Sequence, residues 1–237
     1  MIKAVVFDAY GTLFDVYSIG ALAESLYPTH GASISTLWRD KQIEYTRLIS
    51  LSDPHSPAGS RYYLPFWELT RLSLRYTLER LKLTSTVENE DALMGQYAQL
   101  TAFPENLGVL QALKAKGMAT AILSNGNPEM LSSAVTSAGM KDLLDHVISV
   151  DSIKQFKTSP SSYALVTQYF PVQNDEVLFV SSNAWDALGA TWHGFTTMWV
   201  NRQGLPHETL GPKPSYTGEN LTKVLAVLSV LNTQAST

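Results

Sequence analysis

The sequence lacks cysteine, long apolar runs and any strongly basic segment, and each absence excludes a class of protein. Without cysteine among its 237 residues, the chain has no disulfide, no thiolate metal site and no cysteine nucleophile. No stretch approaches the roughly 18 apolar residues that span a bilayer, and the N-terminal apolar run is too short for a signal peptide. The net charge is −4, with no basic run suited to nucleic acid. We therefore expect a cytoplasmic protein that binds neither nucleic acid nor membranes.

Hydrophobic residues make up 45% of the chain, enough for one sizeable domain or for a core with a smaller second unit. Short helices with recognisable ends separate several apolar runs: Asn127-Pro128 and Ser159-Pro160 suit helix starts, and Gly139 and Gly194 suit helix ends. Strands that alternate with helices predict an α/β fold, a doubly wound, Rossmann-like parallel sheet covered on both faces. The strand-like runs are Ile2–Phe7, Met118–Leu123, His146–Val150, Glu176–Val180 and Thr196–Val200.

The segment 15–100 differs from the rest of the chain because it contains amphipathic stretches but no convincing strand. Phe66, Leu69, Leu72 and Tyr76 recur at helical spacing after Pro65. The Ser-, Pro- and Gly-rich stretch 52–60 is typical of a loop between helices. We therefore predict an α/β core of residues 1–14 and 101–237 with a helical cap subdomain of residues 15–100 inserted after the first strand. The last residues, 233–237, are expected to fray.

Polar residues gather at the carboxyl ends of the predicted strands, which is where parallel α/β sheets bind ligands. The four clusters are Asp8-Ala9-Tyr10-Gly11-Thr12, Ser124-Asn125-Gly126, Lys157 and Ser181-Ser182-Asn183 with Asp186. Because adjacent strand ends converge on one crevice, these clusters predict a catalytic pocket.

These motifs resemble the haloacid dehalogenase superfamily and, within it, the L-2-haloacid dehalogenases. The resemblance to the latter is closest in Leu37–Thr46 and Phe179–Asp186, and it spans nearly the whole chain. It implies hydrolysis of L-2-haloalkanoic acids to D-2-hydroxyalkanoic acids and halide, through an aspartyl ester on Asp8 and with inversion at C2. It further implies no metal and no cofactor, a small 2-haloacid as the partner molecule, and a homodimer.

Tyr10 separates this activity from that of the related phosphatases. Phosphatases of the superfamily usually carry an acidic residue there, which protonates the leaving group, while Mg²⁺ neutralises the phosphoryl charge. Halide leaves as a stable anion and needs no proton, and an ionised Asp8 can attack carbon without a base. The alternatives are that Tyr10 is a packing residue in a degenerate phosphatase, and that Asp8 only satisfies the backbone of a turn.

Lys157 is the candidate cation for the carboxylates of Asp8 and the substrate, which would otherwise repel each other. The alternative is a solvated surface lysine. Tyr163, six residues later, occupies a position that the resemblance places close to the site. Many relatives carry proline directly after this lysine, whereas Thr158 follows here, so the path of the loop and the reach of Lys157 are open at this point.

The resemblance implies that Arg39 receives the departing halide together with Asn125. A guanidinium offers several fixed N–H donors and stays charged at any working pH. The alternative for Arg39 is a solvated helix face. Phe66 and Trp185 are candidates for the apolar wall of the site, and core packing explains them equally well.

The remaining candidates anchor the substrate carboxylate or orient the nucleophile. Ser124 and the backbone N–H groups after Asp8, at Ala9 and Tyr10, suit an anion. Thr12 is expected to orient Asp8. Ser181, Asn183 and Asp186 complete the family pattern; Asp186 would pair with Lys157 or activate the hydrolytic water, although helix capping also explains Asn183 and Asp186. A Mg²⁺-dependent phosphatase and a non-catalytic anion-binding domain are the rival functions.

Overall fold

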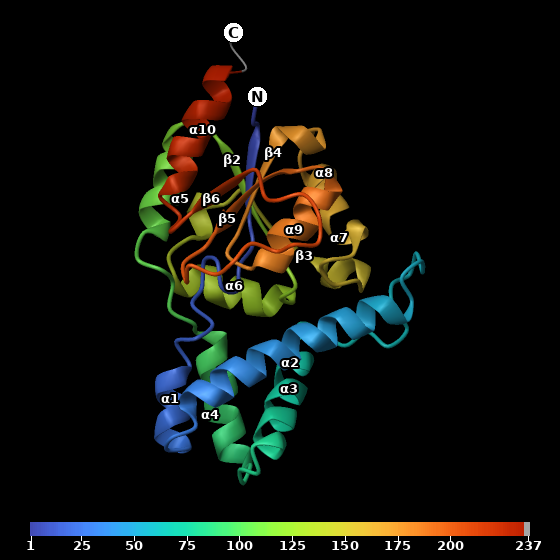
Figure 1. The fold of residues 1–237 in the computed structure, drawn as a ribbon, viewed down its shortest axis with the longest axis vertical. Helices are drawn as coiled ribbons and strands as arrows, with labels where there is room; N and C mark the ends of the chain where they lie inside the picture. Colours follow the sequence, from blue (N-terminus) through green and yellow to red (C-terminus); the bar gives the residue numbers. More distant parts are fainter. Residues whose placement is uncertain (235–237) are drawn as a thin grey trace.

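The computed structural model describes residues 1–234 and contains a six-stranded, fully parallel sheet with helices on both sides (Figure 1). The order of the strands is β3-β2-β1-β4-β5-β6. The doubly wound fold with an inserted helical cap is therefore confirmed. The strands are β1 (Ala4–Phe7), β2 (Ala119–Ser124), β3 (His146–Ser149), β4 (Val177–Ser181), β5 (Thr196–Val200) and β6 (Tyr216–Gly218).

Helices of the core flank the sheet, with α5 and α10 on one side and α7, α8 and α9 on the other (Figure 1). The expected boundaries hold: Asn127 precedes Pro128 at the start of α6, and Gly139 and Gly194 adopt the positive φ angles that suit helix ends. The helices are α5 (Asn106–Ala115), α6 (Pro128–Ser137), α7 (Pro160–Ala164), α8 (Val166–Tyr169), α9 (Ala184–His193) and α10 (Lys223–Gln234), with short 3₁₀ turns at Lys141–Leu143, Val150–Ile153 and Asn174–Glu176.

Two features at the C-terminal end of the chain differ from the sequence expectation. The edge strand β6 was not predicted, because three residues between a Gly- and Pro-containing loop and a turn carry no strand periodicity. Fraying from residue 233 was also expected, but α10 continues to Gln234 and buries Val224, Val227 and Leu228 against the core. Residues 235–237 lie outside the described part of the chain.

The segment after β1 forms four helices that lie beneath the sheet in Figure 1, and we call α1–α4 the helical cap. Pro65 immediately precedes α3, where its fixed φ of −53° suits the start of the helix. No helix within residues 1–234 combines the length and the apolar character needed to cross a membrane. The cap helices are α1 (Gly20–Leu26), α2 (Gly31–Ser52), α3 (Phe66–Arg80) and α4 (Val87–Ala98).

The cap is connected to the core through two chain segments that lie side by side. The backbone N–H of Asp15 donates to the carbonyl of Thr101 at 2.8 Å, and that of Phe103 donates to the carbonyl of Leu13 at 3.2 Å. The outgoing and returning chain therefore form one hydrogen-bonded neck next to the end of β1.

Far from this neck, the end of α2 and the following loop touch the core segment that precedes Lys157. The backbone N–H of Phe156 donates to Ser50 Oγ at 2.8 Å, and the Ser50 hydroxyl donates back to the Phe156 carbonyl at 3.2 Å. The Tyr63 hydroxyl donates to Asp151 Oδ1 at 2.6 Å. The cap is thus tied to the core at the neck and again at the C-terminal end of α2.

Candidate active site

The register of the sheet places the polar clusters at the same edge, beyond the carboxyl ends of β1, β2 and β4. Phe7 of β1 is aligned with Ile122 of β2 and with Val180 of β4, so the residues that follow these three strands emerge side by side. Asp8 is the first residue after β1, the central strand of the three, and it is 5% exposed. The Asp8 carboxylate therefore lies at the middle of the strand edge where the sequence predicts a pocket.

The carboxylate of Asp8 is held by three donors. Thr12 Oγ1 donates to Asp8 Oδ2 at 2.9 Å, and Asn183 Nδ2 donates to the same oxygen at 2.8 Å. Lys157 Nζ donates to Asp8 Oδ1 at 3.1 Å. Thr12 Oγ1 is itself fixed, because it accepts a 2.8 Å hydrogen bond from the backbone N–H of Ser182. Thr12 therefore contacts the carboxylate that it is expected to orient.

Lys157 is buried between two carboxylates although Thr158, not proline, follows it. Its ammonium lies 3.1 Å from Asp8 Oδ1 and 2.9 Å from Asp186 Oδ2, and its side chain is 1% exposed. The peptide bond between Lys157 and Thr158 is cis. The backbone N–H of Lys157 donates to Asn125 Oδ1 at 2.9 Å, which ties this loop to the end of β2. The structure thus places Lys157 beside Asp8 and Asp186 and not on a solvated surface.

Charge in this cluster is unevenly compensated, since one ammonium faces two carboxylates. Burial alone would lower the pKa of Lys157, but Asp186 and Asp8 more than offset it and hold that pKa above its usual value. Burial raises the pKa of Asp186 to about 6, against the opposing effect of Lys157. Both pKa values are raised for compatible reasons. Lys157 has two carboxylates beside it, whereas Asp186 shares the Lys157 ammonium with Asp8 and is repelled by the Asp8 charge.

Asp186 is fully buried and both of its carboxylate oxygens are engaged. Oδ2 accepts from Lys157, and Oδ1 accepts a 2.8 Å hydrogen bond from the Tyr163 hydroxyl. Burial raises the pKa of Tyr163 well above its usual value, so this hydroxyl stays a donor. This geometry favours pairing with Lys157 over activation of water, the two roles open for Asp186.

Arg39 of α2 reaches the nucleophile loop from the cap. Its Nη2 donates to the Tyr10 carbonyl at 3.1 Å and to Asn183 Oδ1 at 3.2 Å. The other end of the Asn183 amide donates to Asp8, so Asn183 links the guanidinium to the nucleophile. Arg39 is therefore directed toward the loop that carries Asp8, and the alternative of a solvated helix face does not describe it.

A set of polar residues behind Arg39 was missed from the sequence. Arg39 Nη1 donates to Gln42 Oε1 at 2.7 Å. The Gln42 amide is buried and also contacts Thr70 of α3 and Tyr97 of α4. The spacing of Arg39 and Gln42, three residues apart on one helix, is a signal that was available. For Thr70 and Tyr97 there was none, because their proximity depends on how α3 and α4 pack.

Aromatic side chains form one wall of the site around Tyr10. The Tyr10 ring stacks on Tyr97 at 5.7 Å between centroids and lies 5.8 Å from Phe66. All three rings are buried. Burial raises the pKa of the Tyr10 hydroxyl well above its usual value, so the side chain stays neutral. Tyr10 and Phe66 therefore contribute apolar surface at the position where a phosphatase would have a carboxylic acid.

The remaining predicted residues make more local contacts. The backbone N–H of Gly126 donates to Ser124 Oγ at 3.1 Å, and that of Asn183 donates to Ser181 Oγ at 3.2 Å, so both hydroxyls shape their loops. The carbonyl of Ala9 accepts from the backbone N–H groups of residues 12–14 and thereby closes the nucleophile turn. Trp185 is half-buried, with the guanidinium of Arg47 5.3 Å from its ring centre.

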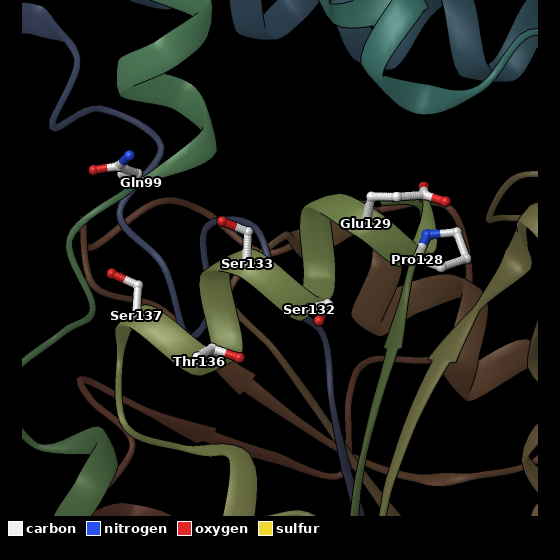
Figure 2. A pocket seen from close by; sticks show the side chains of 7 residues that line it. All are labelled: Gln99, Pro128, Glu129, Ser132, Ser133, Thr136 and Ser137. Atoms are coloured by element: carbon white, nitrogen blue, oxygen red, sulfur yellow. The ribbon is translucent and has the colours of Figure 1, made fainter.

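A surface hollow of about 840 Å³ lies between α6 and the end of α4, apart from this cluster (Figure 2). Gln99 borders it on one side and the hydroxyls of Ser132, Ser133 and Thr136 on the other. None of the predicted site residues lines it. Within residues 1–234, no group of three or more His, Asp or Glu side chains is placed to hold a metal ion.

Comparison with known proteins identifies the same family over most of the chain. The family model described as haloacid dehalogenase-like hydrolase matches residues 2–194. The (S)-2-haloacid dehalogenase of Pseudomonas sp. (strain YL) is 39% identical over 234 residues, which cover 99% of this chain and 96% of that protein.

Two solved structures are similar throughout. The L-2-haloacid dehalogenase RSc1362 has 53% identity and a TM-score of 0.93, covering 96% of this chain and 99% of that one. The L-2-haloacid dehalogenase from Xanthobacter autotrophicus with chloropropionic acid covalently bound has 37% identity and a TM-score of 0.86, covering 97% and 99%.

Proposed function

Because the chain belongs to the haloacid dehalogenase-like hydrolases, we propose that it is an (S)-2-haloacid dehalogenase, which hydrolyses L-2-haloalkanoic acids to D-2-hydroxyalkanoic acids and halide. The observation that carries the proposal is the buried Asp8 carboxylate, held by Lys157, Thr12 and Asn183, with the neutral side chain of Tyr10 two residues later. This arrangement supplies a nucleophile and a charge-compensating cation but no acid for a leaving group. Halide is a leaving group that needs none.

The first step is displacement at carbon. Asp8 Oδ2 accepts two of the hydrogen bonds described above and Oδ1 accepts one, so Oδ1 is the freer oxygen for attack. A bond forms between this oxygen and C2 of the substrate, the bond from C2 to the halogen breaks, and the halide leaves with the bonding electrons. Attack in line with the departing halide inverts C2. The Arg39 guanidinium and the amide N–H groups of Asn125 receive the anion.

The second step is hydrolysis of the ester at the carboxyl carbon of Asp8. Water adds to that carbon, the bond between the carbon and the ester oxygen breaks, and the product keeps the oxygen that came from Asp8. One proton of the water passes to that oxygen to complete the hydroxyl group, and the other is released to solvent as Asp8 returns to its ionised form. The two buried carboxylates and the substrate carboxylate would repel one another in a pocket of low polarity, and Lys157 offsets this repulsion. Asp186 and Tyr163 keep the ammonium in place. The covalent chloropropionic acid in the Xanthobacter relative supports an ester intermediate here.

The donor set supports a metal-independent reaction. The space between Asp8 and Asp186, the two carboxylates that could share a divalent cation, holds the ammonium of Lys157 at 3.1 and 2.9 Å. A second cation there would be repelled by Lys157, and a metal on Asp8 would weaken its carboxylate as a nucleophile. We expect turnover to survive exhaustive chelation. A Mg²⁺-dependent phosphatase would instead lose activity and would hydrolyse phosphate esters.

A single turnover in ¹⁸O-water on (S)-2-chloropropionate tests the mechanism. With enzyme in excess, label should enter the Asp8-containing peptide while the first product carries none. Label in the first product would mean that water attacks C2 directly and would reject the ester. Absence of halide release together with tight binding of the haloacid would indicate the rival, a non-catalytic anion-binding domain.

We also propose that the protein is a homodimer. Large apolar side chains are exposed on α2, on α3 and on the loop between them, including Leu51 at 71% and Tyr62 at 62%. Such a surface is costly to leave in water. Light scattering should give the mass of two chains, and Leu51→Glu should shift it to one. A monomeric wild type would refute the proposed homodimer and would leave the proposed reaction unaffected.

A further inference from the structure

Gln42, Thr70 and Tyr97 surround Arg39 in the interior of the cap, although none of them contacts Asp8. Gln42 is 1% exposed and Thr70 is fully buried. Gln42 Oε1 accepts from Arg39 Nη1 at 2.7 Å, while Gln42 Nε2 donates to Thr70 Oγ1 at 2.6 Å. Buried amides of this kind are costly unless both ends are satisfied, and here both are.

The direction of these hydrogen bonds is fixed by chemistry. A guanidinium can only donate, so the oxygen of the Gln42 amide must face Arg39 and its nitrogen must face Thr70. The Thr70 hydroxyl accepts from Gln42 and donates to the carbonyl of Phe66 at 2.7 Å. The relay therefore runs from Arg39 through Gln42 and Thr70 to the backbone of α3, and it permits a single orientation of each group.

Tyr97 closes the arrangement from α4. Its hydroxyl lies 3.1 Å from Gln42 Nε2 and 3.2 Å from Gln42 Oε1, and its ring stacks on Tyr10. Burial raises the pKa of this hydroxyl, so it stays neutral beside Arg39. A cavity of about 10 Å³ beside Arg39, Gln42 and Tyr97 has room for no more than one water molecule. The guanidinium is therefore confined from behind.

We propose that Gln42, with Thr70 and Tyr97 behind it, is a positioning residue that aims the Arg39 guanidinium at the departing halide. The proposal rests on the proposed function. Arg39 contacts Tyr10 and Asn183 on the side of the nucleophile and Gln42 on the opposite side. Removal of the rear contact frees the guanidinium to rotate about its long side chain, and donors that stabilise a leaving anion work only when they are preorganised.

The test is the leaving-group dependence of a single turnover, because a general loss of structure would slow all substrates alike. Chloride is a poorer leaving group than bromide and depends more on a donor. Gln42→Met keeps the side-chain length but removes the hydrogen bonds of the amide to Arg39, Thr70 and Tyr97. A hydrogen bond to a charged group is worth about 1.5–3 kcal/mol, so we expect about 10- to 100-fold slower halide release from 2-chloropropionate. The loss on 2-bromopropionate should be smaller, so the bromide-to-chloride rate ratio rises.

The chain offers a matched control on α3. Thr70→Val interrupts the relay, whereas Thr77→Val removes an equally buried hydroxyl that makes the same kind of bond, to the Ser73 carbonyl at 2.8 Å. We expect the rate ratio to rise in Thr70→Val and to stay at the wild-type value in Thr77→Val. Thr70→Val also carries the test if Gln42→Met does not fold, which urea unfolding would reveal.

Failure of the two proposals can be told apart. A wild type that releases no halide refutes the proposed function. A wild type that releases halide, with an unchanged rate ratio in Gln42→Met and Thr70→Val, refutes the positioning role alone. An equal rise in Thr77→Val would also refute it, because the effect would then belong to the packing of α3.

Discussion

Replacement of Lys157 by methionine removes an ammonium that two buried carboxylates share. Asp186 is fully buried and Asp8 is 5% exposed, so water does not replace the lost ammonium at either carboxylate. Removal of one partner from a buried ion pair costs about 3–5 kcal/mol. We therefore expect the free energy of unfolding of Lys157→Met to fall by at least about 3 kcal/mol near pH 8, along with loss of halide release.

The size of this loss should depend on pH, with a definite sign. Burial already raises the pKa of Asp186 to about 6, and loss of the ammonium raises it further. Between its unfolded pKa of about 3.9 and its raised folded pKa, the folded state binds more protons than the unfolded state, so stability falls as pH rises through that window. The difference between Lys157→Met and wild type should therefore be larger near pH 8 than near pH 5.

Urea unfolding at the two pH values measures the effect. Lys154→Met, an exposed lysine in the same loop, is the control and should change stability by less than about 0.5 kcal/mol. The double variant Lys157→Met/Asp186→Leu should recover part of the loss because it removes one of the two uncompensated charges. A Lys157→Met protein as stable as the control near pH 8, or a loss that is the same at both pH values, would refute the reasoning.

Three further substitutions test other parts of the structure. Burial raises the pKa of Asp186, and the hydrogen bond from the Tyr163 hydroxyl counters part of that effect. Tyr163→Phe should therefore move the acidic limb of the pH profile of kcat/KM to higher pH, and an unmoved limb would contradict this reasoning. In Gly126→Ala the new methyl would lie 2.7 Å from Cε2 of Tyr10, so the Tyr10 ring must shift. This shift should raise KM for 2-chloropropionate several-fold in steady-state assays. An unchanged KM would mean that the ring does not border the substrate. Gly139→Ala, at a φ of 66°, should cost about 1 kcal/mol in thermal or urea unfolding and leave kcat unchanged; a loss of activity would place α6 in the mechanism.

The sequence predicted the parts of the site that depend on strand ends. Buried apolar runs precede Asp8, Asn183 and Lys157, either directly or by a few residues. In a parallel sheet the residues that follow the strands lie at the same edge. Their contacts with each other follow from the register of three adjacent strands. The role of Arg39 came from the resemblance of its flanking residues, because a lone arginine on a helix carries no comparable signal.

What the sequence did not predict depends on packing between helices. Thr70 and Gln42 are 28 residues apart and meet because α2 and α3 pack closely, which no local pattern specifies. Trp185 follows a motif residue directly, yet helical geometry turns its ring toward Arg47. Both cases reflect the same limit: a strand end fixes which edge a residue occupies, whereas the direction of a side chain on a helix depends on the neighbouring helix.

The length of α2 has a mechanical consequence. Arg39 and Ser50 lie eleven residues apart on this helix, about 16 Å along its axis, and they touch the nucleophile loop and the Lys157 loop respectively. A continuous helix acts as a rigid lever, so a tilt that withdraws the guanidinium also strains the bonds at Ser50. We therefore expect any opening of the cap to release the Arg39 contacts and the Ser50 contacts together.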